Sequence, residues 1–477
     1  MQATPAAAAK ARGSGPVGFD ACPLLALFPD VFASDSLGLH NVRLRIFTPL
    51  ITVILAVCQQ LHHLACRDMV LRLTGLRAAQ GLQPPSASTA AFCKAKMRLP
   101  LGLIEDLISA IAAAAVKGVP RHEFWMGHRV KLLDGTSVSL PDTAANRGRW
   151  PQPTTQKPGE GFPQMRVVAV FSLATGAILA WVTGAYLQGE ATLARELLPA
   201  LQAGDILVRD RAFAGYALIH ELLGRGVHTV TRLAARTKRF QTVGKLGPDD
   251  RLVQLARPTV PSAGYNRQQW RQLSEAMVLR FVEVRVSAPG FRTRSYTLVT
   301  TLLDHRKYTR EALADLYRAR WEVEVDFLHI KTTMRAQMLR ARCPASAERE
   351  LRFVLLAYNV VRAVMARAAA TKSGDPRRLS FAGARGAVSQ LENALGGSTR
   401  RRRLAAIHAV LLALASQPVP LRPDRSEPRA IKRRRKAYPR LRCARADWKE
   451  MPHSSQVYAK AKKERLKAGK AGTMHLS

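Results

Sequence analysis

The spacing of apolar and polar positions divides the chain into helical and β-rich regions. Between about 20 and 120, apolar residues recur at helical intervals without the alternation typical of strands. From 129 onward, short apolar runs end at turn residues, and this pattern predicts strands. The predicted order is strand, strand, strand, helix, strand, helix, strand, over residues 130–133, 167–173, 178–183, 190–201, 206–208, 216–223 and 227–232.

A second β pattern interrupts this order between 237 and 292. Apolar and polar residues alternate clearly over 278–286, and the interruption is far longer than an ordinary loop. After it we predict a strand, a helix, a second helix and one last helical stretch, at 296–301, from about 309, at about 347–370 and at about 401–415.

These patterns predict the α/β fold class, with a mixed-sheet core and a β-rich insertion. An all-helical domain precedes the core, and a helical and basic tail follows it. The Ala-, Gly- and Pro-rich beginning of the chain is expected to be disordered. The expected boundaries are 1–19 for the disordered segment, 20–125 for the helical domain, 126–236 and 293–371 for the core, 237–292 for the insertion and 372–477 for the tail.

One predicted helix gathers polar side chains on a narrow stripe. Residues 317–331 include neither Gly nor Pro and are mostly good helix formers. At about 100° per residue, a stripe roughly 60° wide holds Tyr317, Arg320, Glu324 and Lys331. An adjacent apolar stripe can face a core and holds Leu316, Val323, Phe327 and Ile330. Glu322 and Asp326 fall on the far side. The stripe suits a metal-binding acid beside a polyanion, and its alternative is a solvated face of salt bridges.

Two aspartates at strand ends extend this acidic chemistry. Asp134 follows the apolar run 130–133, and Asp210 follows the run 206–208 and Arg209. Each aspartate alone is more often a turn or cap residue. With Glu324 they make three acids that follow one another along the core.

The composition favours a polyanionic partner. The 477 residues are 47% hydrophobic, which is enough for a substantial core, and 74 Lys and Arg against 34 Asp and Glu give a net charge of +40. Such an excess rewards the neutralisation of nucleic-acid phosphates. A generally Arg-rich composition is the alternative, but it does not explain the low acidic count.

Cysteines and apolar stretches indicate a cytosolic protein without a membrane span. The six cysteines contain no CxxC pair and are expected to be reduced thiols. The pair His62 and His63 has no zinc-type cluster around it. No secretory signal is evident, and the apolar run 46–58 is too short to span a bilayer, so it predicts a buried helix.

The acidic motifs resemble those of a known enzyme family. Tyr317, Arg320, Glu324 and Lys331 have the spacing of the YREK signature of bacterial insertion-sequence transposases with an RNase-H-like DDE domain. The segment 133–136, Leu-Asp-Gly-Thr, resembles the first-Asp motif of this family, and 210–226, which begins Asp-Arg-Ala-Phe, resembles the second. The resemblance covers roughly 40–440. It implies an RNase-H-like catalytic core, which the predicted element order also fits.

The resemblance implies a metal-dependent active site built from Asp134, Asp210 and Glu324. Carboxylate oxygens bind hard divalent cations, and two Mg²⁺ ions about 3.5–4 Å apart can activate the attacking oxygen and stabilise the leaving one. Asp134 is expected to bridge both ions, with Asp210 and Glu324 holding one each. Mn²⁺ is expected to substitute for Mg²⁺.

The same resemblance assigns DNA-binding roles to several residues. Tyr317, Arg320 and Lys331 would contact phosphates near the cleaved end, and Lys331 lies about 10 Å along the helix from Glu324. The other DNA-binding candidates are Arg211, Arg232 and Tyr296. The ring of Tyr296 could stack on a flipped base or pack in the sheet, and Trp270 is a further stacking candidate.

Two basic regions are candidates for additional DNA contacts. The predicted helix 88–99 carries Lys94, Lys96 and Arg98 and could recognise DNA ends, or it could belong to an ordinary bundle. The tail is either a solvated polycation or a weak, nonspecific DNA contact.

Taken with the resemblance, the motifs predict a DNA transposase that cuts and pastes an insertion sequence. Its expected partners are double-stranded DNA, as terminal inverted repeats and target, and a second protomer in the synapse. It is expected in the bacterial cytoplasm, associated with the nucleoid and with no membrane. Two alternatives remain: an RNase-H-like nuclease that only hydrolyses DNA, and an inactive, transposase-derived DNA-binding protein.

Overall fold

The computed structural model describes residues 22–32, 46–119, 124–154, 161–233, 240–285, 295–394 and 399–420. The segment 1–19, expected to be disordered, and the basic tail beyond 420 lie outside these ranges. Within them the chain is an α/β protein with a large mixed sheet, so the predicted fold class is confirmed at this level.

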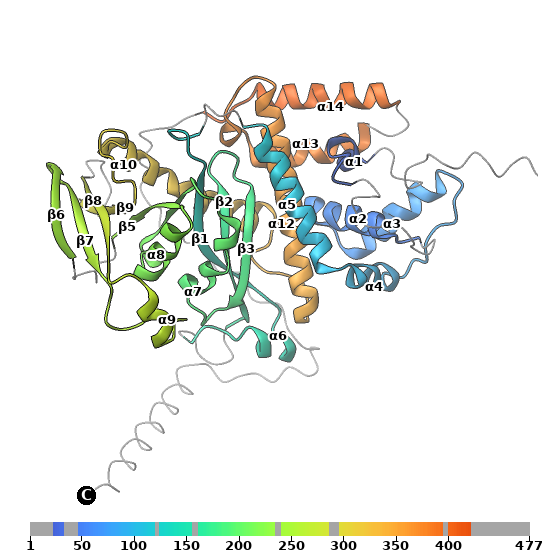
Figure 1. Ribbon diagram of the computed structural model, residues 1–477. Helices are drawn as coiled ribbons and strands as arrows, with labels where there is room; N and C mark the ends of the chain where they lie inside the picture. The colour runs from blue at the N-terminus through green and yellow to red at the C-terminus, as the bar shows by residue number, and fades with distance from the viewer. Residues whose placement is uncertain are drawn as a thin grey trace, which may run out of the picture. The chain divides into compact units, whose positions relative to one another are not determined.

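Nine strands form one sheet in the order β3-β2-β1-β4-β5-β9-β8-β7-β6 (Figure 1). Strand β1 pairs antiparallel with β2 and parallel with β4, and β4 pairs parallel with β5. All pairs from β5 through β9 to β6 are antiparallel. The strands are β1 Val130–Ser139, β2 Gln164–Ser172, β3 Ile178–Ala185, β4 Ile206–Arg209, β5 His228–Arg232, β6 Phe240–Gly247, β7 Asp250–Ala256, β8 Ala276–Arg285 and β9 Ser295–Thr300.

The expected insertion continues the sheet. Strand β8 pairs with β9 from Arg280 opposite Thr300 to Arg285 opposite Ser295, and β7 and β6 follow outward. A short helix, α9 Arg267–Gln272, lies between β7 and β8 in the sequence. The segment is therefore β-rich, and its strands share the backbone hydrogen bonding of the central sheet.

Helices cover both faces of the sheet (Figure 1). On one face, α7 Glu190–Arg195 and α8 Tyr216–Gly224 pack their leucines against β1, β2 and β4. The predicted helix 190–201 is in fact interrupted, because α7 gives way to a 3-10 turn, η3 Leu198–Ala200, around Pro199. The other short elements between strands are α6 Ala144–Arg149 and the 3-10 turn η4 Arg211–Phe213.

The opposite face packs against the helical run that contains Glu324 and against a long helix, α12 Pro344–Ala370. Helix α12 is long and apolar enough to cross a membrane, but 89% of its apolar window is buried inside the protein. It therefore acts as a core helix. Helix α5 Leu101–Lys117 packs along α12 and also contacts β3.

The remaining helices surround α12 on the side away from the sheet (Figure 1). The predicted apolar helix at 46–58 is present and buried as α2. Helix α13 was not predicted, because its small and polar residues give no clear apolar repeat. These helices are α1 Pro23–Leu27, α2 Pro49–His62, α3 Cys66–Ala78, α4 Ala90–Arg98, α13 Phe381–Ala394 and α14 Arg400–Ala415, with a 3-10 turn, η7 Pro376–Arg378, before α13.

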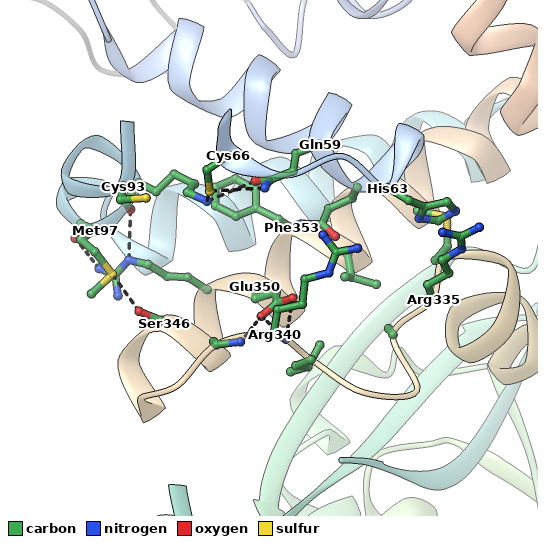
Figure 2. Close-up of a pocket in the computed structure, with 18 residues that line it drawn as sticks. Gln59, His63, Cys66, Cys93, Met97, Arg335, Arg340, Ser346, Glu350 and Phe353 are labelled. Carbon is green, nitrogen blue, oxygen red and sulfur yellow. Dashed lines mark hydrogen bonds between the residues drawn. The ribbon is translucent and has the colours of Figure 1, made fainter. Parts of the chain in front are cut away.

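A cavity of about 310 Å³ lies among these helices (Figure 2). Residues of α2, α3, α4 and α12 line it, together with the segment 334–341 that precedes α12. None of the residues that line the cavity belongs to β1 or β4, the interior strands near Asp134 and Asp210.

Candidate active site

The strand register brings Asp134 and Asp210 together. Leu133 of β1 pairs with Arg209 of β4, so the two aspartates are the next residues on neighbouring parallel strands. Adjacent strands lie about 4.8 Å apart. Side-chain alternation gives both aspartates the face that carries Leu132 and Val208, which is the face of the Glu324 helix.

Asp134 is held in a partly buried, charged setting. Its Oδ1 accepts the Gly135 N–H at 2.8 Å, and its Oδ2 lies 3.8 Å from Nη1 of Arg320. Burial raises the pKa of Asp134 to about 6, and the charges of Glu190 and Asp210 act in the same direction. The Gly135 N–H and Arg320 oppose this rise.

Asp210 caps the 3-10 turn that follows β4. Its Oδ1 accepts the backbone N–H of Arg211 at 2.6 Å, while its carbonyl accepts the Thr231 hydroxyl at 3.1 Å. The Arg211 side chain is exposed. Arg211 therefore contacts the acidic site through its backbone, and its guanidinium is open to solvent.

Glu324 faces Asp134 with Arg320 between them. Nη2 of Arg320 donates to Oε1 of Glu324 at 3.0 Å, four residues along the helix. Burial would lower the pKa of Arg320, but the neighbouring Tyr317, Glu324, Asp210 and Asp134 raise it. The guanidinium therefore remains a cation that two of the three carboxylates share.

The helix that carries Glu324 is less regular than predicted. It consists of α10 Arg310–Arg318, a 3-10 turn η5 Ala319–Trp321, α11 Glu322–Leu328 and a π turn η6 His329–Thr333. The prediction of one uniform α-helix over 317–331 was wrong in this detail. In the π turn, the Met334 N–H bonds to the His329 carbonyl at 2.8 Å, five residues back.

An aromatic and basic cluster adjoins the acids. The rings of Tyr296 and Tyr317 lie 5.6 Å apart, and the Arg232 guanidinium lies 5.5 Å from the Tyr296 ring. Burial raises the pKa of Tyr317 to about 12, and the charge of Arg320 acts against the rise. Tyr296 is half-buried, with Tyr317 and Arg232 against its ring. The other stacking candidate, Trp270, is buried, and its indole N–H donates to the Pro258 carbonyl.

Lys331 reaches β1 two residues beyond Asp134. Its Nζ donates to the Thr136 hydroxyl at 3.1 Å, and burial lowers the pKa of this lysine. The sequence placed Lys331 on the stripe of Glu324, about two helical turns further along. The structure brings it to the same strand as Asp134, so it lies beside the acids.

The three acidic side chains are of the chemical type that binds a hard divalent cation. Asp134, Asp210 and Glu324 offer carboxylate oxygens, the ligands that such ions prefer. In the part of the chain that the structure describes, no three His, Cys, Asp or Glu side chains stand close enough together to ligate one ion. The Arg320 guanidinium occupies the space between two of the donors.

Two residues near the site were missed in the sequence. Glu190, at the start of α7, packs under β1: a Cβ added at Gly135 would lie 2.7 Å from its Cδ. Trp321 is 62% exposed on the turn between Arg320 and Glu322. No sequence pattern marks Glu190, whereas the aromatic Trp321 directly follows the signature arginine Arg320 and could have been singled out.

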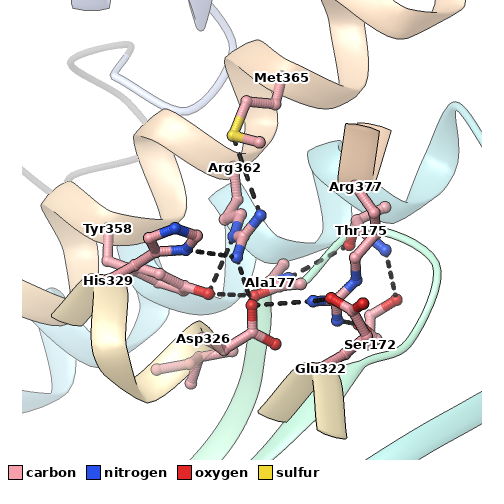
Figure 3. Close-up of polar contacts among 12 residues, drawn as sticks. Ser172, Thr175, Ala177, Glu322, Asp326, His329, Tyr358, Arg362, Met365 and Arg377 are labelled. Carbon is pink, nitrogen blue, oxygen red and sulfur yellow. Dashed lines mark hydrogen bonds and ion pairs between the residues drawn. The ribbon is translucent and has the colours of Figure 1, made fainter. Parts of the chain in front are cut away.

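A buried ionic cluster anchors the far side of the Glu324 helix (Figure 3). Asp326 is fully buried and accepts hydrogen bonds from Arg362 of α12 and from Arg377, the latter at 2.9 Å. Arg362 also donates to the Tyr358 hydroxyl at 2.9 Å and meets Nδ1 of His329 at 3.1 Å. Asp326 thus points away from Glu324, as predicted, but into the core.

The cluster ties this helix to the turn between β2 and β3. Arg377 donates to the carbonyls of Ser172 and Leu173, and the Tyr358 hydroxyl donates to the Gly176 carbonyl at 2.7 Å. Gly176 has a φ of 72°, and a Cβ there would lie 2.6 Å from Cζ of Arg362. Glycine is therefore required at this contact.

Two aspartates aligned by the strand register and a helical glutamate, with Arg320 and Lys331 beside them, are chemically suited to binding divalent metal ions next to a phosphodiester. The family described as "Transposase DDE domain" matches residues 125–360. The transposase InsG for insertion sequence element IS4 of Escherichia coli (strain K12) is 28% identical over 363 residues, which are 74% of this chain and 79% of InsG. The chain therefore belongs to the DDE transposase family, and the predicted resemblance is confirmed.

Two further similarities were found. The putative transposase InsZ of the same organism is 27% identical over 139 residues, or 28% of this chain and 46% of InsZ. The piggyBac transposase in a synaptic complex with hairpin DNA has a TM-score of 0.39 and 9% identity, over 86% of this chain and 88% of that one. As a member of its family, the chain is a DNA transposase, an enzyme class that cleaves and joins DNA strands with divalent metal ions.

Proposed function

We propose that this transposase moves an insertion sequence by cut-and-paste chemistry at Asp134, Asp210 and Glu324. The observation that supports this most directly is the strand register, which aligns the two aspartates on the face that Glu324 approaches. The same helical run carries Tyr317, Arg320 and Lys331 beside these acids.

The proposed catalytic core has an RNase-H-like fold. Its strands β3-β2-β1-β4-β5 have the mixed pairing described above, with only β2 antiparallel to its two neighbours. Helices on both faces and a long helix after the last acid complete it. In this proposal 126–236 and 293–371 form the core, 237–292 the insertion and 20–125 a DNA-binding helical domain.

The three carboxylates would hold Mg²⁺, with Mn²⁺ as a substitute. When bound, two such ions activate the attacking oxygen and neutralise charge on the leaving one. Asp134 neighbours Asp210 through the β1–β4 register and shares Arg320 with Glu324, so it is the proposed shared ligand. Its raised pKa shows that burial and nearby acids already disfavour its charged form, which an added cation would relieve.

The chain's own cations and rings would hold the DNA end. Lys331 and Arg320 lie within reach of β1 near Asp134 and would contact phosphates. Tyr317 and Arg232 frame Tyr296, whose ring would meet a displaced base. The exposed guanidinium of Arg211 would add a phosphate contact beside Asp210.

The proposed partners are the terminal inverted repeats of the element, its target DNA and a second protomer in the synapse. The +40 net charge supports binding to long polyanions. Helix α4, with Lys94 and Arg98 exposed, is the candidate for recognition of the ends. We place the enzyme in the bacterial cytoplasm, at the nucleoid.

Isosteric variants of the acids test this function. Asp134→Asn, Asp210→Asn and Glu324→Gln should each lower Mg²⁺-dependent cleavage of element ends by about two orders of magnitude or more, because several kcal/mol of transition-state stabilisation would be lost. Binding to the ends should persist. The matched control is Glu322→Gln, on the same helix, which can still accept a hydrogen bond from Arg377.

The products of this assay separate the proposal from its alternatives. Joined products are expected from the unmodified protein with paired ends. Cleavage without joining would indicate a nuclease, and end binding without cleavage would indicate a DNA-binding protein. Equal losses in the Glu322 and Glu324 variants would contradict the assignment of Glu324.

A further inference from the structure

Two thiols face the cavity among α2, α3, α4 and α12. Cys66 is the first residue of α3, and Cys93 lies in the first turn of α4. Both line the 310 Å³ cavity, where Figure 2 labels them, and both side chains are partly exposed. The two side chains are in hydrogen-bonding contact with one another. Cys66 and Cys93, which are 27 residues apart in the sequence, thus line the same cavity.

Cys66 is surrounded by hydrogen-bond donors. Its Sγ accepts from Nζ of Lys96 at 3.2 Å and from Nε2 of Gln59 at 3.4 Å. Nζ of Lys96 also donates to Oε1 of Gln59 at 3.1 Å, which fixes the ammonium beside the sulfur. A cation and two donors aimed at one sulfur favour its thiolate form, and so does its place at a helix N-terminus.

The two thiols differ in acidity. Burial would raise the pKa of Cys66, but the charge of Lys96 and the hydrogen bonds from Gln59, Lys96 and Cys93 lower it below its usual value. Burial raises the pKa of Cys93, and the negative charge at Cys66 adds to this rise. Cys66 is therefore the thiol that more readily becomes a nucleophilic thiolate. Cys93 stays protonated until Cys66 has been oxidised.

The other described cysteines lack this setting. Cys22 and Cys58 are buried. Cys343 is exposed, and its Sγ donates to the Ser346 hydroxyl at 3.2 Å, whereas Sγ of Cys66 accepts from the Lys96 ammonium. Exposure alone would make Cys343 the first thiol to be modified, whereas activation by a cation would favour Cys66.

We propose that Cys66 and Cys93 form an oxidant-reactive dithiol, in which Cys66 reacts with peroxides and Cys93 closes a disulfide between α3 and α4. This modification site is independent of the acidic site and of the transposase reaction. It rests on the shared cavity, on the contact between the thiols and on the Lys96–Cys66 pair.

The reaction balances with a hydroperoxide as the named oxidant. The Cys66 thiolate attacks one peroxide oxygen, so an S–O bond forms, the O–O bond breaks and hydroxide leaves. The sulfur is oxidised by two electrons and the peroxide is reduced. Cys93 then attacks the sulfenic acid, an S–S bond forms, and the S–O oxygen leaves as water with the Cys93 proton.

Peptide mapping of the full-length protein tests the proposal. The reduced protein is treated with hydrogen peroxide in small excess, remaining thiols are alkylated, and a nonreducing digest is analysed by mass spectrometry. We expect a cross-linked peptide pair that contains Cys66 and Cys93, while Cys343 remains alkylated. In Cys93→Ser, a dimedone adduct should accumulate on Cys66; in Cys66→Ser, neither product should form.

A lysine variant separates activation from proximity. Lys96→Gln keeps both cysteines and the Gln59 contact but removes the charge, so oxidation of Cys66 should slow several-fold. Lys94→Gln, an exposed change on the same helix, should not alter the rate. Preferential oxidation of Cys343, disulfides only between molecules, or an unchanged rate in Lys96→Gln would overturn the proposal.

Discussion

Arg320 lies between two of the acids that the sequence predicts as metal ligands. It pairs with Glu324 at 3.0 Å and lies 3.8 Å from Asp134, so it competes with any cation for the same oxygens. Sequence alone assigned Arg320 only to phosphate. The structure adds a second role. If Arg320 moved from the carboxylates of Asp134 and Glu324 to a DNA phosphate, both carboxylates would become free to bind metal.

Replacing Arg320 should therefore affect metal and DNA in opposite directions. Arg320→Gln removes the competing charge, so Mg²⁺ or Mn²⁺ should bind the free protein more tightly, as measured by calorimetry. Affinity for element ends should fall, because one phosphate contact is lost. Unchanged metal affinity in this variant would show that the guanidinium does not compete for the carboxylates.

Lys331 should affect DNA alone. Its Nζ donates to the Thr136 hydroxyl, so Lys331→Gln should lower end affinity and reduce the salt slope by about one. Metal binding should remain as in the unmodified protein. Lys245→Gln, an exposed lysine on β6, is the matched charge control. A raised Mg²⁺ requirement with an unchanged salt slope would remove Lys331 from the phosphate contacts.

For single residues, the sequence indicated which side chains are candidates for the site, but not which other side chains they contact. Asp134, Asp210 and Glu324 were candidates from apolar runs, helical spacing and the family motifs. The predicted end of the first strand was wrong, because β1 continues through Asp134 to Ser139, whereas Asp210 directly follows β4. The proximity of Glu190 to Asp134 could not be predicted, because it depends on how α7 crosses beneath β1. No local pattern encodes that crossing.

Among the elements, the Glu324 helix shows where a uniform period fails. The 3-10 turn before Glu322 and the π turn after Leu328 change the rotation per residue on both sides of α11. Arg320 lies inside the 3-10 turn, and its side chain still reaches Glu324, four residues further along, at 3.0 Å. Lys331, inside the π turn, is directed to β1 instead of along the stripe.

The buried cluster behind this helix should make stability depend on pH through His329. Burial lowers the pKa of His329 to about 4, and the charges of Arg362 and Arg377 add to the effect. The unfolded chain, with an ordinary pKa near 6.5, then binds the proton more strongly. The contribution of His329 to stability is present above about pH 6.5 and is lost as the pH falls towards 4.

His329→Gln should remove this part of the acid sensitivity. The glutamine oxygen can accept from Arg362 but does not titrate, so the fall in melting temperature between pH 7 and pH 5 should be smaller than in the unmodified protein. His408→Gln, on the exposed side of α14, should leave the fall unchanged. His63, whose pKa burial also lowers to about 4, accounts for acid sensitivity that remains. An identical fall in His329→Gln would contradict the assignment.

For the whole molecule, the sequence predicted the β character of 237–292 but not its place. The alternation over 278–286 is a local pattern that the sequence shows directly. The pairing of β8 with β9 instead joins residues that are 10 to 20 positions apart, from Arg285 opposite Ser295 to Arg280 opposite Thr300, and it depends on backbone hydrogen bonds. The same holds for α12. Its apolar composition marks it as buried, yet only the fold shows that it lies between the sheet and the outer helices.

The basic tail should strengthen DNA binding without reading sequence. Residues from 422 onward combine many Lys and Arg, including the run 432–436, with several prolines and little apolar periodicity. Lys and Arg side chains that hold no fixed positions relative to one another can neutralise phosphates. They cannot make the ordered set of hydrogen bonds to base edges that reads a sequence. Their contribution should therefore be electrostatic and screened by salt.

Truncation after residue 420 should lower the affinity for element ends and for random duplexes by a similar factor, most clearly at low salt. The ratio of the two affinities should stay nearly constant, and the salt slope should become shallower for both. Neutralising 432–436 in the full chain should give a smaller loss of the same kind. A truncated protein that bound random DNA normally but lost its preference for element ends would show that the tail reads sequence, and would move end recognition away from α4.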